Sequence, residues 1–279
     1  MLSLQTIALT LLPVVLLGSS AVPERDHKSQ PLVIGETFTI ASQQLDETRR
    51  INVYMPPVDS LSTRLPVLYM PDGGMAEDFL HVAGLVQVGV GNGTMRPFLL
   101  VGIENTQRRR DLTGPTEDAE DRKIAPRVGG SQAFRAFLRE ELMPQVRQRY
   151  RTTEESAIVG ESLAGLFVIE TFFREPELFD HYVALDPSLW WNNHALVNES
   201  AALLRSRPGL EKTLYFASSD EKGIAELTQK LATILGEAAP AGVTWHYDPM
   251  PEESHGTIYH PGALKAFRRV LGPKTRMGK

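Results

Sequence analysis

Ser162 lies in the segment GESLAG at residues 160–165, directly after a short apolar run and before an amphipathic one. A serine at a sharp turn from a strand into a helix is held above the sheet, where its hydroxyl can attack a carbonyl carbon. Small residues suit such a turn, because larger side chains would collide with the neighbouring strand or helix. The pattern predicts a nucleophilic serine, with a structural turn serine as the alternative.

A serine nucleophile needs a base, and His255 is the preferred candidate. It lies in the loop at residues 251–257, after the last predicted strand and before the last predicted helix, where an α/β-hydrolase places its imidazole. His260 is the rival base. No two histidines have the spacing of zinc ligands on one helix, so we expect neither a metal site nor a cofactor. The chain has seven histidines in all: His27, His81, His181, His194, His246, His255 and His260.

The acid that orients the base has three candidates at strand ends. Asp220 and Glu221 follow the strand predicted at 213–217, and they give the order serine, acid, histidine that is typical of α/β-hydrolases. They are therefore the preferred pair, although Asp220 also suits the N-cap of the helix that follows. Asp186, which ends the strand predicted at 182–185, is the third candidate.

Backbone N–H groups must stabilise the charge that develops on the carbonyl oxygen during attack. The N–H of Leu163, at the start of the helix after the serine, is one predicted donor. A second is expected from Gly73 and Gly74, which follow a buried strand and can bring their backbone close to a substrate. A plain loop turn is the alternative at these glycines.

The predicted elements that position these residues form one α/β domain at 31–273. Segments 32–41 and 49–55 alternate apolar and polar residues around a turn at 43–48, which predicts an antiparallel pair with one wet face. Continuous apolar runs at 65–70 and 98–103 predict strands buried on both faces. Beyond them we expect strands at 156–159, 182–185, 213–217 and 243–247, and helices at 131–150, 163–173, 224–235 and 261–271.

The alternation of strands and helices predicts a fold class. We expect an α/β fold of the α/β-hydrolase type: a mostly parallel central sheet, an antiparallel N-terminal ribbon and helices on both faces. The Pro- and Gly-rich stretch at 114–130 is irregular, and its length indicates an active-site loop.

Composition excludes several classes of protein. The chain has 279 residues, of which 42% are hydrophobic and 23% charged, as in a soluble globular protein. Its net charge of −5 offers no global attraction for a nucleic acid, so no such partner is expected. The absence of cysteine excludes disulfides, thiolate metal sites and a cysteine nucleophile.

The N-terminal segment has the character of a leader. Residues 1–21 carry no charged side chain, and 7–17 are mostly apolar but too few to span a bilayer, which predicts a signal peptide. A stray hydrophobic helix is the alternative. Residues 22–30 are then a linker and 274–279 a tail. We expect a secreted or periplasmic protein, without stable membrane insertion once the signal peptide is cleaved.

Five segments together resemble the putative esterase family, the esterase-D-like α/β-hydrolases that include the trilactone siderophore esterases. The resemblance runs from about residue 34 to 271 and implies that Ser162 is the nucleophile, that His255 is the base and that the Gly73/Gly74 turn forms the oxyanion region. The segments are LPVLYMPDGG at 65–74, VGIENTQRRRDLT at 101–113, GESLAGLF at 160–167, DPSLWWNN at 186–193 and SHG at 254–256.

The sequence departs from this family at two positions of the elbow. Glu161 stands where the family often has histidine, and Ala164 replaces the usual second glycine. Some siderophore esterases of the family work with a serine and histidine alone, so the resemblance leaves the acid open between Asp220 and Glu221, or neither.

Arginine and tryptophan pairs are the candidates for substrate binding. Arg108 and Arg110 follow a buried strand, and guanidinium groups there would attract an anionic ester such as a ferric catecholate complex. A solvated loop, or an arginine paired with Asp111, is the alternative. Trp190 and Trp191 are expected either to form an aromatic wall of the cleft or to pack in the core.

These observations predict a serine esterase that cleaves carboxylic esters through an acyl-enzyme intermediate. Its partner is a small-molecule ester, and nothing in the pattern sets an oligomeric state. An acyltransferase with the same serine and histidine, or a ligand-binding homologue without catalysis, are the alternatives.

Overall fold

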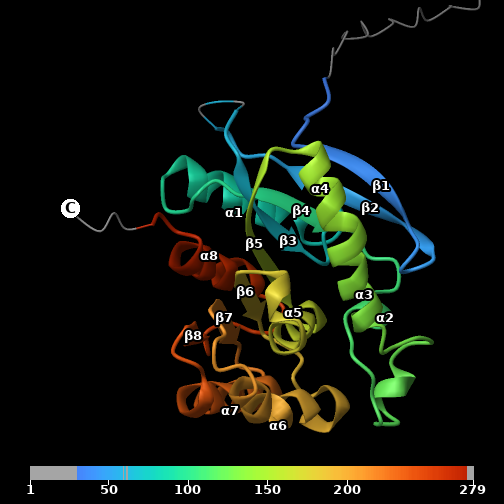
Figure 1. Ribbon diagram of the computed structural model, residues 1–279, viewed down its shortest axis with the longest axis vertical. Coiled ribbons are helices and arrows are strands. Elements are labelled where there is room, and N and C mark those ends of the chain that lie inside the picture. Colours follow the sequence, from blue (N-terminus) through green and yellow to red (C-terminus); the bar gives the residue numbers. More distant parts are fainter. Residues whose placement is uncertain (1–29, 59, 61, 275–279) are drawn as a thin grey trace, which may run out of the picture. The chain divides into compact units, whose positions relative to one another are not determined.

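A computed structural model describes residues 30–58, 60 and 62–274, and within them eight strands form one sheet (Figure 1). Their order is β1-β2-β4-β3-β5-β6-β7-β8. The β1–β2 and β2–β4 pairs are antiparallel, and all pairs from β4 to β8 are parallel. This confirms the predicted parallel sheet with an antiparallel N-terminal ribbon. The strands are β1 (Glu36–Ser42), β2 (Glu47–Tyr54), β3 (Leu65–Met70), β4 (Leu99–Ile103), β5 (Thr152–Glu161), β6 (His181–Leu185), β7 (Lys212–Ser218) and β8 (Val243–Pro249).

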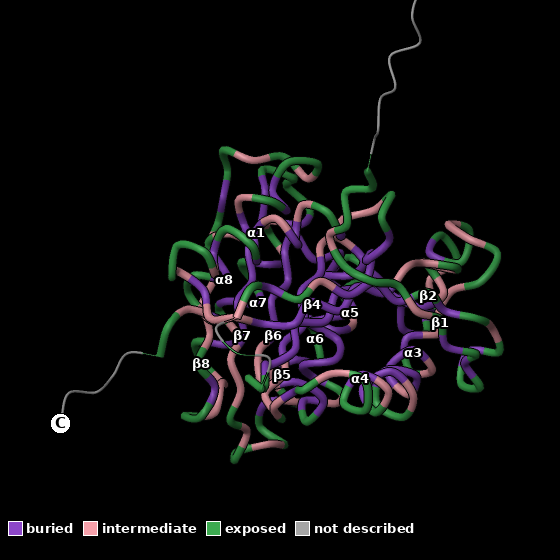
Figure 2. Tube along the Cα trace, turned by 90° about the horizontal axis from the view of Figure 1, so that it is seen from above, coloured by how far each residue is buried: buried purple, intermediate pink, exposed green. Residues whose placement is uncertain are grey.

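Helices cover both faces of the sheet. Because successive strand residues point to opposite faces, Leu68 belongs to one apolar cluster and Tyr69 to the other. The first cluster lies under α1 and α8, and the second under α3 to α7. Figure 2 shows the buried residues gathered along the strands between these layers. The helices are α1 (Phe79–Gly91), α2 (Arg108–Asp111), α3 (Ser131–Phe137), α4 (Met143–Arg149), α5 (Leu163–Arg174), α6 (Trp191–Arg205), α7 (Lys222–Ala238) and α8 (Tyr259–Val270).

The helices differ from the predicted pattern at two places, and α1 and α2 were not among the ranges predicted as helices. The helix expected at 131–150 is α3 and α4 joined by a π-helical turn at Leu138–Leu142, next to Pro144, which has no N–H to donate to the preceding turn. Helix α6 was not predicted. Its first turn holds three consecutive residues with positive φ, a conformation outside the right-handed helical region: Asn192, Asn193 and His194.

The ends of the chain are outside this description. The predicted signal peptide at 1–21, most of the linker at 22–30 and residues 275–279 of the tail lie beyond the described residues. The compact unit that carries the sheet runs from Ile34 onward. In the part of the chain that the structure describes, no helix is both long and apolar enough to cross a membrane.

A buried ion pair ties the N-terminal ribbon to α2. Arg49 on β2 is completely buried, and its Nη1 lies 2.8 Å from Asp111 Oδ2 and 2.8 Å from Glu47 Oε1. The guanidinium also lies 5.2 Å from the centre of the Phe134 ring. A charge so far from water is tolerated only with its partners in place.

We expect Asp111→Ala to destabilise the fold strongly, because it leaves the Arg49 charge buried with Glu47 alone. The expected loss in free energy of unfolding is about 3 kcal/mol, measured by urea denaturation. Glu117→Ala is the control, since Glu117 pairs with Arg122 but is 94% exposed and such pairs contribute at most about 1 kcal/mol. Equal losses in the two variants would contradict this account.

Candidate active site

Ser162 stands at a sharp turn between β5 and α5. Its backbone has φ 59° and ψ −121°, a conformation that non-glycine residues rarely adopt and that costs of order 1–3 kcal/mol. The Ser162 N–H donates to the carbonyl of Leu185 on β6 at 3.0 Å. A Cβ at Gly160 would lie 2.6 Å from the backbone of Ala164, and one at Gly165 would lie 2.9 Å from Leu185 O. The small residues are therefore required by close backbone packing, as predicted.

His255 reaches the serine from the loop that follows β8. Its Nε2 lies 3.1 Å from Ser162 Oγ, and its Nδ1 lies 2.6 Å from Asp186 Oδ2. A neutral ring with its proton on Nδ1 donates to Asp186 and accepts the serine proton at Nε2. The rival His260 lies on α8, where its ring is 5.5 Å from that of His81.

The carboxylate beside His255 is Asp186, at the end of β6. It is completely buried, and its two oxygens accept hydrogen bonds from Ser219, one from the N–H at 2.7 Å and one from the hydroxyl at 2.8 Å. Because β6 is the neighbour of β5 in the sheet, Asp186 emerges beside the serine. Its φ of 45° is a further unusual conformation, so its direction is fixed both by the backbone and by Ser219.

The preference for Asp220 and Glu221 as partners of His255 is wrong, because Asp186 is the carboxylate bonded to the ring. Both are exposed, and within the described residues neither side chain bonds the imidazole. The Asp220 N–H donates to Glu253 O, and the residue of this loop that reaches the centre is Ser219. The position of Asp186 directly after an apolar run and before Pro187 marks it as a candidate in the sequence, whereas its burial and its contact with Ser219 come from the fold.

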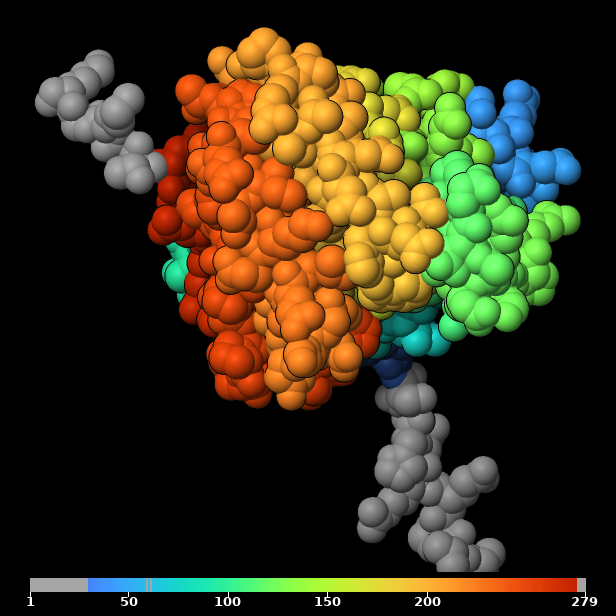
Figure 3. All heavy atoms as spheres, turned by 90° about the horizontal axis from the view of Figure 1, so that it is seen from below, coloured from blue at the N-terminus to red at the C-terminus, as the bar shows by residue number. Residues whose placement is uncertain are grey.

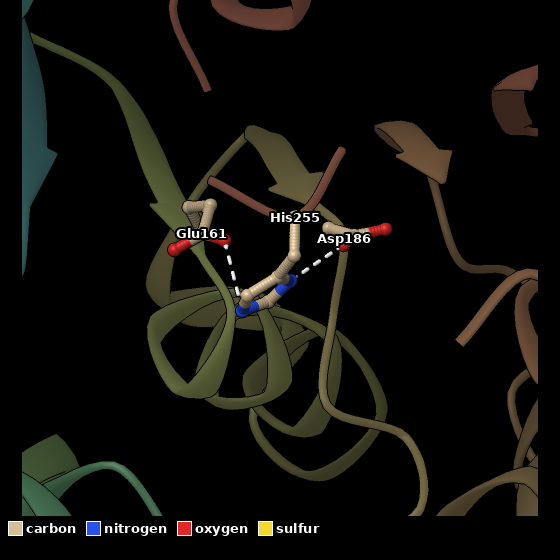
Figure 4. Close-up of side chains that lie close together, drawn as sticks. All are labelled: Glu161, Asp186 and His255. Carbon is tan, nitrogen blue, oxygen red and sulfur yellow. Dashed lines mark hydrogen bonds and ion pairs between the residues drawn. The ribbon is translucent and has the colours of Figure 1, made fainter. Parts of the chain in front are cut away.

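Two ionisable groups at this centre have shifted pKa values. The hydrogen bond that His255 donates to Asp186 raises the pKa of the ring, and the charge of Glu161 adds to the shift. Burial raises the pKa of Glu161 to about 7. Glu161 Oε1 lies 3.4 Å from His255 Nε2, so the ring lies between two carboxylates (Figure 4).

Glu161, Asp186 and His255 also form the one group of acids and histidines, within the described residues, that is compact enough to be considered for a metal ion. The two carboxylates, however, approach different ring nitrogens. One ion cannot bind both nitrogens of a ring, so the carboxylates are placed as partners of the imidazole, Asp186 as a hydrogen-bond acceptor and Glu161 as a charged neighbour.

The predicted oxyanion donors differ in whether their N–H groups already have a hydrogen-bond acceptor. Leu163 is the first residue of α5, so its N–H has no carbonyl to bond within the helix and is available. The Gly73 N–H donates to Ile103 O at 2.9 Å, and the Gly74 N–H donates to Glu77 Oε2 at 2.7 Å. Both glycine amides are therefore occupied in this structure, which does not support them as free donors. A Cβ at Gly73 would lie 2.3 Å from Gly102, so the glycine is required by packing.

The two arginines proposed for substrate binding are paired within the protein. Arg108 forms a two-pronged contact with Asp72 at 2.7 and 2.8 Å, and Arg110 bonds Glu47 and Asp111. The pairing of Arg110 with Asp111 is the alternative considered above. Both still line a cavity of about 510 Å³, together with two exposed arginines, Arg109 and Arg127.

The two tryptophans proposed for substrate binding differ in their exposure. Trp190 is 37% exposed, whereas Trp191 is buried and its Nε1 donates to Gly114 O at 2.9 Å. Asp121 Oδ2 accepts the Asn192 N–H at 2.7 Å, a second link between segment 114–130 and the start of α6. Figure 3 shows this green segment against the yellow-orange start of α6. Trp191 thus anchors the irregular segment, and Trp190 alone is free to contact a ligand.

Comparison with known proteins gives one family. The family model described as "Putative esterase" matches residues 42–240 of this chain. The ferri-bacillibactin esterase BesA of Bacillus subtilis (strain 168) is 27% identical over 279 aligned positions, which cover 87% of this chain and 92% of BesA. The siderophore triacetylfusarinine C esterase of Aspergillus fumigatus is 30% identical over 164 positions, 51% of each chain.

The fold has a close counterpart among solved structures. The IroE-like serine hydrolase of Shewanella oneidensis superposes with a TM-score of 0.74 at 28% identity, covering 85% of this chain and 80% of that one. The predicted α/β-hydrolase fold is thereby confirmed.

Proposed function

This chain belongs to the Putative esterase family and is a carboxylic ester hydrolase, and from that premise we propose that it opens siderophore trilactones through an acyl-enzyme intermediate on Ser162. The observation that carries the proposal is the hydrogen-bond chain from Ser162 Oγ through His255 to Asp186, with the serine held at a strained turn. This is the arrangement by which a weak nucleophile is activated by an oriented base.

The proposed reaction has two halves. His255 Nε2 takes the proton of Ser162 as Oγ attacks the ester carbonyl, and the N–H of Leu163 donates to the oxyanion. The ring then gives that proton to the leaving alcohol oxygen, and the acyl group stays on Ser162. In the second half His255 takes a proton from water, the resulting hydroxide attacks the acyl group, and the proton returns to Ser162. Asp186 stabilises the imidazolium in both halves.

Two features support a siderophore as substrate. The relatives described above are esterases of ferri-bacillibactin and of triacetylfusarinine C by name. The cavity whose lining includes the exposed Arg109 and Arg127 also suits a negatively charged molecule, because arginine binds anions with several donors at once. A ferric tris-catecholate carries a net negative charge, whereas a simple ester carries none.

The experiment compares a tris-catecholate trilactone, with and without Fe(III), with p-nitrophenyl acetate. We expect Arg127→Ala to raise KM for the ferric complex about 5-fold, with no change for the neutral ester, because one attractive charge is lost. Arg268→Ala, which removes an exposed arginine of α8 outside this cavity, should change neither value. A wild-type enzyme that hydrolyses simple esters but leaves every trilactone intact would exclude this substrate class.

Export of the enzyme stays a prediction from the sequence, since the signal peptide predicted at 1–21 lies outside the described residues.

A further inference from the structure

Glu161, the last residue of β5, places a second carboxylate against the imidazole of His255. Its Oε1 lies 3.4 Å from Nε2, the same nitrogen that lies 3.1 Å from Ser162 Oγ (Figure 4). The Glu161 side chain is 15% exposed, and Oε1 is buried without any hydrogen-bond partner among the described residues. A buried carboxylate oxygen without a donor is costly, so its position beside Nε2 calls for an explanation.

The other charged groups around Glu161 do not satisfy this oxygen. Arg108 on α2 acts on it only at a distance, because its guanidinium is bound in a two-pronged contact to Asp72, after β3. Asp186, at the end of β6, and Asp72 repel a negative charge on Glu161. Glu221 also acts on His255, and the buried phenol of Tyr259 faces Glu161, Asp72 and Asp78.

We propose that Glu161 is a positioning residue that stabilises the protonated ring of His255 from the Nε2 side during ester hydrolysis. This inference rests on the roles proposed above for Ser162 and His255. When the serine proton moves to Nε2, the new N–H lies between Glu161 Oε1 and the leaving oxygen. The ring is then held by Asp186 at Nδ1 and by Glu161 at Nε2 while the tetrahedral intermediate exists. The proton is still delivered to the leaving alcohol, so Glu161 itself gains and loses nothing over a cycle.

The arrangement has a consequence for pH dependence. The working form has Glu161 ionised and His255 neutral, and burial raises the pKa of Glu161 to about 7. Asp186 and Glu161 both raise the pKa of His255. Because both groups must lose a proton before the site is active, the acid limb of activity should involve two protons over the pH range in which Glu161 and His255 titrate. As the pH falls through this range both groups are protonated and activity is lost.

The test is the pH profile of kcat/KM for a p-nitrophenyl ester between pH 5 and 9. In Glu161→Gln we expect the acid limb to become a one-proton step and to move down by about one pH unit, because the ring loses a negative neighbour. The plateau should fall about 10-fold, because the imidazolium is less stable. Glu252→Gln, which removes an exposed charge from the loop of His255 itself, should keep the wild-type profile. Identical limbs in wild type and Glu161→Gln would overturn the proposal.

A second measurement needs no turnover and so separates this inference from the proposed function. The His255 Cε1 proton resonance can be titrated by NMR in the Ser162→Ala background, with and without Glu161→Gln. We expect the pKa of His255 to be about one unit lower when Glu161 is absent. An unchanged pKa would overturn the role of Glu161 even if ester hydrolysis by Ser162 is established, and the expected shift would uphold it even if the siderophore substrate proves wrong.

Discussion

Ser162→Ala should lower kcat for p-nitrophenyl acetate by at least about 10³-fold, because it removes the atom that forms the acyl-enzyme. Only the hydroxyl is lost, since the Cβ and the strained turn remain. The measurement is steady-state hydrolysis, supported by mass spectrometry of the enzyme after reaction with a slowly deacylating ester. The wild type should gain the mass of the acyl group, and the variant should not.

The control for this experiment is Ser254→Ala. Ser254 is a second serine of the loop that carries His255, and its hydroxyl lies 3.3 Å from Thr257 Oγ1 at an exposed position. We expect this variant to keep activity within about 3-fold and to be acylated like the wild type. Equal rates in wild type and Ser162→Ala, measured on purified protein, would remove the basis for the proposed mechanism.

Asp186→Asn should lower kcat by about 10³-fold or more while the fold is kept. Asp186 Oδ1 accepts the Ser219 N–H, so an asparagine must place its carbonyl oxygen there and turn its NH₂ group toward His255 Nδ1. The ring would then carry its proton on Nε2, facing Ser162, and could not accept the serine proton. The loss should persist at high pH, because it reflects the tautomer of a neutral ring.

Asp220→Asn and Glu221→Gln are the matched controls for this prediction. Both side chains are exposed, and the chain order of serine, acid and histidine is the same for them as for Asp186. We expect kcat to change by less than about 3-fold in either variant. A large loss in one of them, together with an active Asp186→Asn, would show that the acid that orients His255 lies in the loop after β7.

The strands that are buried on both faces could be predicted from the sequence, because their residues form continuous apolar runs. The apolar runs at Leu65–Met70 and Leu99–Ile103 are β3 and β4, at or next to the centre of the sheet, where both faces exclude water. Helix α6 could not be predicted from periodicity. Asn192 has positive φ because Asp121 and segment 114–130 bind its backbone and side chain, a contact between positions 71 residues apart.

The site was predictable in part for a similar reason. Ser162 and His255 stand in local patterns, a turn of small residues and a loop before a helix, that short segments reveal. The choice among the acids depends on which strand is adjacent to β5 and on where Ser219 binds, and neither property is local. The sequence also did not show that the Gly74 N–H already has an acceptor, because its partner Glu77 belongs to a loop whose conformation the sequence pattern does not specify.

Because the carboxylate that bonds His255 is Asp186, directly after β6, the loop after β7 contributes only one residue to the hydrogen bonds of the site, Ser219. The next four positions, 220–223, are exposed and precede the first buried residue of α7, Ile224. The backbone there is tied to the site, because the Asp220 N–H donates to Glu253 O in the loop of His255 and the Glu221 N–H donates to Ser219 Oγ. The exposed side chains at these positions can therefore vary, whereas a change in the length of this loop would shift two residues that hold the imidazole and its carboxylate.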